Sequence, residues 1–433
     1  MSDHPVRLLL EDDLSRSRLT VFFRLLLAIP HFIWLALWSI AAIFAAIAGW
    51  FAALVTGRLP SGLHNFLGSY VRYATHLGGY LSLAANPYPG FTGEPGYPVD
   101  VIIPERQPQP RWKTALRLVL AIPALLLAAV LGSGFGGGNY SSTTGNEAST
   151  AQWFTSTGIG GVAALCAFFG WFASLALGRM PLGLRNLGAY GIGYTAQAYA
   201  YVLLLTDRYP NSDPEALGPR WELKPNPVRL ELADDGRRSR LTVFFRLLLS
   251  IPHFVWLSLW SAAAFLAAIA NWFVVLVRGR SAEPLHRFLA AYIRYDTHVT
   301  AFLFLIANPF PGFVGTPGYP VDVAIDPPER QNRWITLFRL FLALPAFLLS
   351  SALSVVLAVL GFLGWFAALV TGRMPTGLRN LGAFCVRYLA QANAYWLLVT
   401  DTYPHASPAL RPPPQLEPEL ELEPGLPSAP DAA

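Results

Sequence analysis

The sequence has little charge and almost no cysteine. Charged residues make up 13% of its 433 residues and hydrophobic residues 54%, whereas a soluble domain carries roughly 25% charged residues. This shortage of charge excludes an ordinary soluble protein and indicates an integral membrane protein. The two cysteines, Cys166 and Cys385, lie in apolar segments without CxxC or Cys/His spacing, so we interpret them as packing residues rather than metal ligands.

The sequence also lacks the motifs of the common catalytic sites. It contains no Gly-rich phosphate loop, no HExxH, no GxSxG and no Walker-type lysine. Its net charge of +5 comes from Lys and Arg that are spread over repeated segments, a distribution that suits lipid headgroups better than nucleic acid. We therefore predict no catalytic residue, no cofactor, no bound metal and no nucleic-acid partner.

What the sequence has instead is a fourfold repeat. In each copy an Arg stands six residues before the Pro of an Ile-Pro or Leu-Pro pair, and a Trp-Phe and a Gly-Arg follow. Such regularity means that one structural unit was copied. The copies occupy residues 1–96, 97–213, 214–318 and 319–406. A Gly/Ser/Thr-rich insertion at 132–160 interrupts the second copy, and the acidic, Pro-rich tail at 407–433 has the composition of a disordered segment.

Each copy contains a long apolar run, residues 19–57 in the first, which only Arg24 and His31 interrupt. As one helix this run would be about 58 Å long, nearly twice the roughly 30 Å of bilayer hydrocarbon. The insertion of the second copy aligns with the midpoint of the run, and insertions are tolerated at exposed turns. The sequence therefore predicts a transmembrane hairpin in each copy, with helices at about 19–38 and 40–57, and eight spans in total. Arg24 and its counterparts would then snorkel to the headgroups.

After each Gly-Arg, an amphipathic stretch predicts a helix at the membrane interface. In the first copy Leu67 and Val71 lie on its apolar face, and Arg72 and His76 lie on the other face. If every such helix crossed the bilayer instead, twelve spans would result. The predicted hairpin tips carry no Lys or Arg, so the positive-inside rule places the tips away from the cytoplasm and the termini within it.

Ahead of each apolar run, an alternating stretch predicts a short β-strand. The four stretches read PVRLLLE, PVDVIIP, PVRLELA and PVDVAID. Because a lone strand is not stable in water, we expect the four to pair with one another or to lie against the interfacial helices. The predicted fold is thus an all-α membrane protein of four tandem repeats, with a small β element on its cytoplasmic side.

Three strings of the first copy carry a family resemblance: RLLLAIPHFIWLALW, WFAALVTGRLPSGL and VRYATHLGGYLSLAANPYPGF. They resemble the bacterial membrane family known as domain of unknown function 4389, and the endings LLLTDRYP and LLVTDTYP of the second and fourth copies are similar to the same pattern. The resemblance covers residues 5–410 apart from the insertion and a linker at about 211–226. It implies tandem membrane domains of a bacterium, here a multi-pass protein of the inner or plasma membrane, and it implies no particular activity.

The arginines of the Gly-Arg turns are the first candidates for a role. They stand at the ends of the predicted membrane helices, where a cation can contact lipid phosphates. The structural alternative is that Gly followed by a cation simply ends a helix. The candidates for headgroup contacts are Arg58, Arg179, Arg280 and Arg373.

Histidines are the other candidates. The first and third copies share three pairs, which are His31/His253, His64/His286 and His76/His298. An ionisable group within a membrane segment suggests metal or proton chemistry, and the first and third pairs are the candidates for it. The alternative is that these copies are alike only because half of the protein was duplicated. At the position of His64 the other copies have Arg185 and Arg379, which suggests a headgroup contact there.

These features favour a non-enzymatic membrane protein of the cell envelope that acts as a scaffold, a lipid-organising module or a partner-binding module. Its partners would be the lipid bilayer, other membrane proteins or further copies of itself. The alternative is a small-solute transporter or channel, because internal repeats are common in that class. A transporter requires polar groups at mid-membrane, where only His31 and His253 fall.

Overall fold

The computed structural model describes residues 4–132, 161–217 and 224–410, and these are mostly helical. One arrangement occurs four times, as a short strand, a long apolar helix and a helix of 21 residues. The predicted insertion at 132–160 lies outside the described residues except for its first residue, Gly132. So does the predicted disordered tail from residue 411 onwards. The described part of that tail contributes to the core, since Ser407 is 0% exposed.

The long apolar runs are continuous helices, so the predicted hairpins are wrong. α10 (Arg246–Arg278) and α13 (Arg339–Thr371) run through the predicted turns without a break. In the first copy only Ala28 separates α1 (Arg18–Leu27) from α2 (Ile29–Thr56). In the first, third and fourth copies the predicted turns contain apolar residues and Ser but no Gly, Pro or Asn, so nothing in them ends a helix. These helices, here called rods, are roughly 50 Å long or more, and the count of eight spans loses its basis.

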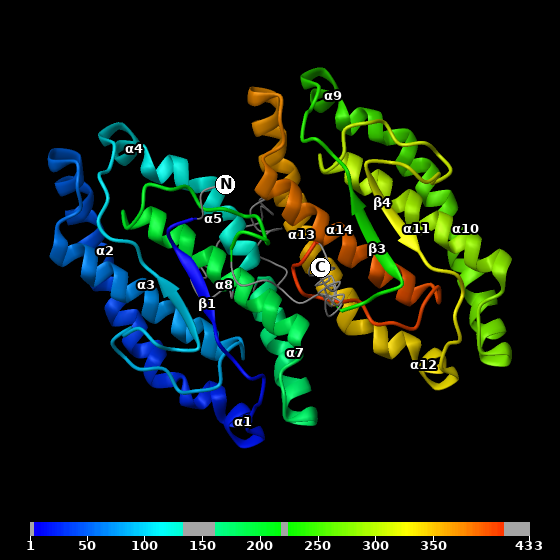
Figure 1. Cartoon of the computed structure of the whole chain (residues 1–433), viewed down its shortest axis with the longest axis horizontal. Coiled ribbons are helices and arrows are strands. Elements are labelled where there is room, and N and C mark those ends of the chain that lie inside the picture. Colours follow the sequence, from blue (N-terminus) through cyan, green and yellow to red (C-terminus); the bar gives the residue numbers. More distant parts are fainter. Residues whose placement is uncertain (1–3, 133–160, 218–223, 411–433) are drawn as a thin grey trace, which may run out of the picture.

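The second copy has the same rod in two pieces. α5 (Arg117–Leu131) and α7 (Val162–Leu177) flank the insertion and lie end to end along α8 (Leu182–Val202) (Figure 1). The insertion therefore interrupts a rod and does not lengthen a turn between two helices. For this reason its position wrongly indicated a hairpin. Short helices precede the rods of the second, third and fourth copies: α4 (Arg111–Ala115), α9 (Arg240–Phe244) and α12 (Arg333–Leu337).

The four predicted strands are confirmed, and they pair in twos. β1 (Arg7–Leu10) is antiparallel to β2 (Val99–Ile102), and β3 (Val228–Leu232) is antiparallel to β4 (Val321–Ile325). They form two separate two-stranded sheets. One sheet joins the first copy to the second, and the other joins the third copy to the fourth.

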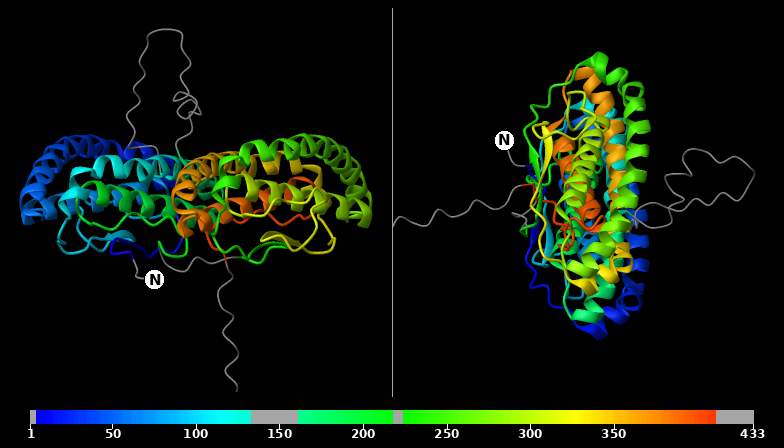
Figure 2. Two further views of the ribbon diagram at one scale, coloured as in Figure 1. Left: turned by 90° about the horizontal axis from the view of Figure 1, so that it is seen from above. Right: turned by 90° about the vertical axis from the view of Figure 1, so that its right-hand side faces the viewer.

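The molecule is a flat body of three layers, with the rods on one face and the strands and loops on the other (Figure 2). The middle layer consists of α3 (Ser61–Leu81), α8, α11 (Glu283–Leu303) and α14 (Thr376–Trp396), each in contact with a rod and with a strand. These are the helices that we expected at the membrane interface, and they lie inside the protein instead. Their polar faces meet the strand layer, as when Gln197 Nε2 donates to the carbonyl of Val6 at 2.8 Å.

Paired copies are joined by reciprocal hydrogen bonds from tryptophan side chains. The indole of Trp50 donates to the carbonyl of Thr114 in the second copy, and Trp171 of the second copy donates to Val21 in the first. The third and fourth copies repeat this exchange. Each rod therefore ends beside the beginning of its partner, so paired rods are antiparallel while their strands share one face.

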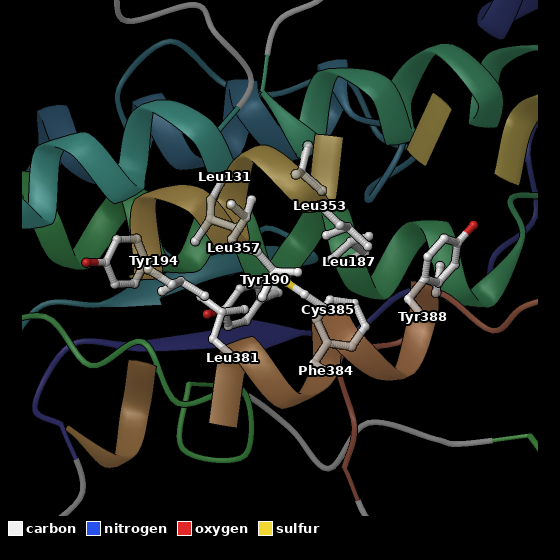
Figure 3. Packing of buried hydrophobic residues seen from close by; sticks show 14 of the residues in the cluster. Leu131, Leu187, Tyr190, Tyr194, Leu353, Leu357, Leu381, Phe384, Cys385 and Tyr388 are labelled. Carbon is white, nitrogen blue, oxygen red and sulfur yellow. The ribbon is translucent and has the colours of Figure 1, made fainter. Parts of the chain in front are cut away.

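The two halves of the molecule meet in one buried core. Figure 3 shows Leu187 and Tyr190 of α8 close to Leu357 of α13 and Cys385 of α14. Both cysteines are buried and unpaired, which agrees with their interpretation as packing residues. Cys166 belongs to the same core.

Candidate functional site

The arginine that precedes each Ile-Pro or Leu-Pro is buried, so the prediction that it snorkels to the headgroups is wrong. Arg246 donates to the carbonyl oxygens of Phe302 and Ala307, and its guanidinium lies 4.3 Å from the centroid of the Phe302 ring. The Phe302 carbonyl belongs to the last turn of α11 and the Ala307 carbonyl follows it, where backbone oxygens lack helical partners and the helix dipole is negative. The four arginines, each 1–2% exposed, are Arg24, Arg117, Arg246 and Arg339.

A strained turn follows each 21-residue helix. The φ angles of Leu83, Leu204, Leu305 and Leu398 lie between 59° and 64°, a left-handed conformation that costs a residue with a side chain about 1–2 kcal/mol. A second polar side chain holds the turn, because Arg238 Nη2 donates to the Leu305 carbonyl at 2.7 Å and Gln331 Nε2 to the Leu398 carbonyl at 2.8 Å. The first two copies do the same. The repeated arginine therefore stabilises the end of a helix.

His31 and His253 lie within aromatic surroundings. The Nδ1 atom of His31 is 2.8 Å from the hydroxyl of Tyr73, and its ring stacks on Phe91 with the centroids 4.3 Å apart. His253 makes the equivalent contacts in the third copy. Within residues 4–132, 161–217 and 224–410, no group of three or more His, Cys, Asp or Glu side chains is placed to hold a metal ion.

His76 and His298 face the strand layer. The Nε2 atom of His76 lies 2.9 Å from Asp100 Oδ1, and Arg72 Nε lies 3.4 Å from the same oxygen. The third copy repeats this cluster. Burial raises the pKa of Asp100, but hydrogen bonds from His76 and from two backbone N–H groups outweigh burial and hold the pKa below its ordinary value. The cluster joins α3 to β2 of the next copy. His76 therefore contacts Asp100, whereas His31 contacts Tyr73, so the structure does not bring the two histidines together in one site.

Asp296 of α11 gives a pH-dependent prediction. Its carboxylate accepts a hydrogen bond from Asn393 Nδ2 at 3.1 Å. Burial raises the pKa of Asp296 to about 6, and the bond from Asn393 lowers it only in part. The ordinary pKa is about 3.9, so as the pH rises the unfolded chain releases this proton first. The carboxyl group therefore destabilises the fold progressively between about pH 4 and pH 6, by at most about 3 kcal/mol.

We therefore expect Asp296→Asn to unfold at a higher temperature than the wild type at pH 7.5 and at the same temperature near pH 3.5. The asparagine keeps an acceptor for Asn393 and cannot ionise. Thermal unfolding of the detergent-solubilised chain, followed by circular dichroism from pH 3.5 to 8, measures the difference. A difference that stays constant across this range would contradict the prediction.

The Gly-Arg turns end the rods as the structural interpretation predicts. Their glycines adopt φ angles between 69° and 72° at the C-terminal ends of α2, α7, α10 and α13. The carbonyl of Gly57 accepts a hydrogen bond from the N–H of Gln109 in the paired copy at 2.8 Å, and the other three turns do likewise. The arginines that follow are exposed; their contact with headgroups stays a prediction. They are Arg58, Arg179, Arg280 and Arg373.

An open polar cleft of about 540 Å³ lies beside Arg58. One wall is α3, which contributes His64 and Arg72, and the other is the segment after β2, which contributes Glu105 and Arg106. Sequence reasoning marked the positions of Arg58 and His64 for headgroup contacts but missed Arg106. No pattern in the sequence signals that this segment of the second copy folds back onto a helix of the first.

The comparisons with known proteins concern the same repeated unit. The family described as "Domain of unknown function (DUF4389)" matches residues 18–92, 151–212, 240–314 and 333–407. No curated protein matches the chain. No solved structure matches it either. The family matches cover the rod and the helix that follows it in the first, third and fourth copies, and α7 and α8 in the second, and together they span more than half of the chain. This protein therefore belongs to the family Domain of unknown function (DUF4389), as four tandem copies.

Proposed function

We propose that this protein is a non-enzymatic membrane protein that lies along one leaflet of a bilayer, organises the lipids there and presents its strand layer to partner proteins. The single observation that carries the proposal is the exposed apolar face of the rods. Phe44 is 69% exposed, and Leu247 and Phe341 are each 72% exposed. Three rods are also long and apolar enough to cross a membrane. Lipid is the occupant that suits such a broad apolar surface.

The strand layer supports an orientation with the rods parallel to the membrane plane. Both sheets lie on the face opposite the rods (Figure 2), and one of them carries the exposed ion pair between Arg229 and Asp326 at 2.7 Å. A rod that crossed the bilayer would take these charges into the hydrocarbon, where a charged side chain costs about 3 kcal/mol or more. With the rods lying flat, the apolar face meets lipid and the strand layer meets water.

Basic residues at both ends of the rods support the same orientation. Exposed arginines bound the third rod at Arg240 and Arg280 and the fourth at Arg333 and Arg373. In a flat orientation all of these ends reach the headgroups of a single leaflet. We therefore replace the eight or twelve spans of the sequence prediction with embedding in one leaflet. The cytoplasmic leaflet of a bacterial plasma membrane remains the location that we propose, because basic residues favour that side.

Labelling both ends of one rod tests this orientation. We expect Ser239→Cys and Arg278→Cys, at the two ends of the third rod, to react with an impermeant thiol reagent from the same side of sealed vesicles. Leu259→Cys, between them on the lipid-facing surface, should be protected. The native cysteines are fully buried, so each variant carries one reactive thiol. Modification of the two ends from opposite sides would show that the rod crosses the bilayer and would overturn the proposal.

A flux measurement separates this function from transport. The two histidines on which a transporter would depend, His31 and His253, are buried against Tyr and Phe side chains, which supports a function without transport. We expect liposomes that contain the protein to retain trapped ions and small solutes as well as protein-free liposomes do. A flux that His31→Ala combined with His253→Ala abolishes would establish the transporter alternative instead.

A further inference from the structure

We propose that the cleft beside Arg58 binds a phosphate group, which belongs either to a phospholipid headgroup or to a soluble phosphate ester. The cleft is formed by residues of the first copy and by the segment of the second copy that follows β2. The inference rests on the side chains that line the cleft. It does not depend on how the rods lie in the membrane.

The charges around the cleft favour an anion. Arg58 and Arg106 are exposed at its rim, and neither forms an ion pair within the described chain. Arg72 is 20% exposed and is held in place by Asp100 at 3.4 Å. Glu105, also exposed, is the one carboxylate among the lining residues. Two uncompensated guanidinium groups across one cleft can each donate paired N–H groups to phosphate oxygens.

His64 is the second, independent observation. Its side chain lines the cleft and is 7% exposed, yet its Nε2 atom has no hydrogen-bond partner in the described part of the chain. Buried polar atoms normally have partners. Burial lowers the pKa of His64, against opposing contacts with Asn65 and the Pro104 carbonyl, and Arg106 lowers it further. The ring is therefore uncharged near pH 7, and a ligand in the cleft would give Nε2 the hydrogen-bond partner that the described chain does not supply.

The third copy repeats only part of the lining of this cleft. It has counterparts of Arg58 and His64 in Arg280 and His286, and the Nε2 atom of His286 also lacks a hydrogen-bond partner in the described chain. However, Ala291 replaces Ser69 and Pro328 replaces Arg106, so a hydroxyl and a guanidinium are missing from these two positions, and the arginine of that segment is Arg330, which forms a backbone bridge with Arg280. Arg280 is thus a matched control within the same molecule, because it ends an equivalent rod with an equivalent exposure.

The test measures phosphate binding to the detergent-solubilised full chain by isothermal titration calorimetry, with glycerol 1-phosphate and inorganic phosphate as probes. We expect Arg58→Ala combined with Arg106→Ala to weaken binding by roughly a hundredfold, or about tenfold for each charged contact. Both side chains are exposed, so the fold should survive, and circular dichroism verifies this. Ser69→Ala, which installs the third-copy residue, should weaken binding several-fold. Arg280→Ala should leave binding of these two soluble probes unchanged.

A second arm distinguishes the sources of the phosphate. The same variants are reconstituted in phosphatidylcholine nanodiscs that contain phosphatidic acid, and the phosphatidic acid retained on the protein is counted by native mass spectrometry. Binding of the soluble probes identifies a free phosphate ester as a ligand, and retention of phosphatidic acid alone identifies the headgroup. The proposal is overturned if the wild type and the double variant are alike in both arms, or if Arg280→Ala reduces binding of the soluble probes as much as the double variant does.

Discussion

Replacing Arg246 by methionine is expected to lower the free energy of unfolding by about 3–5 kcal/mol. Methionine fills most of the volume but donates no hydrogen bond. The carbonyl oxygens of Phe302 and Ala307 would then stay buried without their charged donor. The left-handed turn at Leu305 would also lose part of its support. The loss should reach the whole third copy, because this turn joins α11 to the loop that leads to β4.

The matched control is Arg278→Met, which removes an exposed arginine from the other end of the same rod. We expect this variant to unfold within about 0.5 kcal/mol of the wild type, as surface substitutions usually do. Unfolding of both variants in detergent, by denaturant titration with tryptophan fluorescence, gives the comparison. Equal stabilities would show that the buried guanidinium contributes nothing and that its contacts are incidental.

Gly93→Ala is the second substitution with a large expected effect, a loss of about 2–4 kcal/mol. Gly93 has a φ angle of +66°, and a Cβ atom there would lie 2.3 Å from the backbone oxygen of Ser69 on α3. The backbone of a helix cannot move aside as a flexible side chain could. The loop must therefore shift away from α3, and Phe91, which stacks on His31 in that loop, must shift with it.

Gly90→Ala is the control for this substitution. Gly90 belongs to the same loop, but a Cβ atom there would meet nothing within 4 Å. We expect no loss of stability, and a small gain is compatible with the reduced entropy of the unfolded chain. Thermal unfolding of the two variants under the same conditions measures the difference. If Gly93→Ala and Gly90→Ala unfold at the same temperature, the close approach of the loop to α3 does not constrain the fold.

Local patterns accounted for several elements of this fold. The alternation in PVRLLLE and its three counterparts predicted the strands, because a strand with one buried face requires that alternation whatever lies opposite it. The glycine of each Gly-Arg turn predicted a helix end, because a left-handed φ angle is nearly free for glycine alone. In both cases the determining interaction is within a few residues of the pattern.

The hairpin prediction was wrong because it assumed how the apolar helix is oriented relative to the membrane. The prediction took the rod axis to be perpendicular to the bilayer, so a run of 39 residues had to fold back on itself. A helix satisfies its own backbone hydrogen bonds at any length, and it needs no turn if it lies along the membrane. The buried arginines were misjudged similarly. Their carbonyl partners lie 56 or more residues away in the chain, and the spacing of nearby residues does not predict contacts over that separation.

The sequence by itself determined that this is an apolar, fourfold repeated chain that resembles one family, with a strand, a long apolar helical run and an amphipathic helix in each copy. Composition and periodicity are properties of neighbouring residues, so the sequence contains them in full. Only the tertiary structure decided that copies pair by exchanging contacts, that the arginines before the Ile-Pro and Leu-Pro pairs point inward, and that Arg106 of one copy and Arg58 of another line the same cleft. Those contacts join residues far apart in the chain, and they exist only once the layers have packed together.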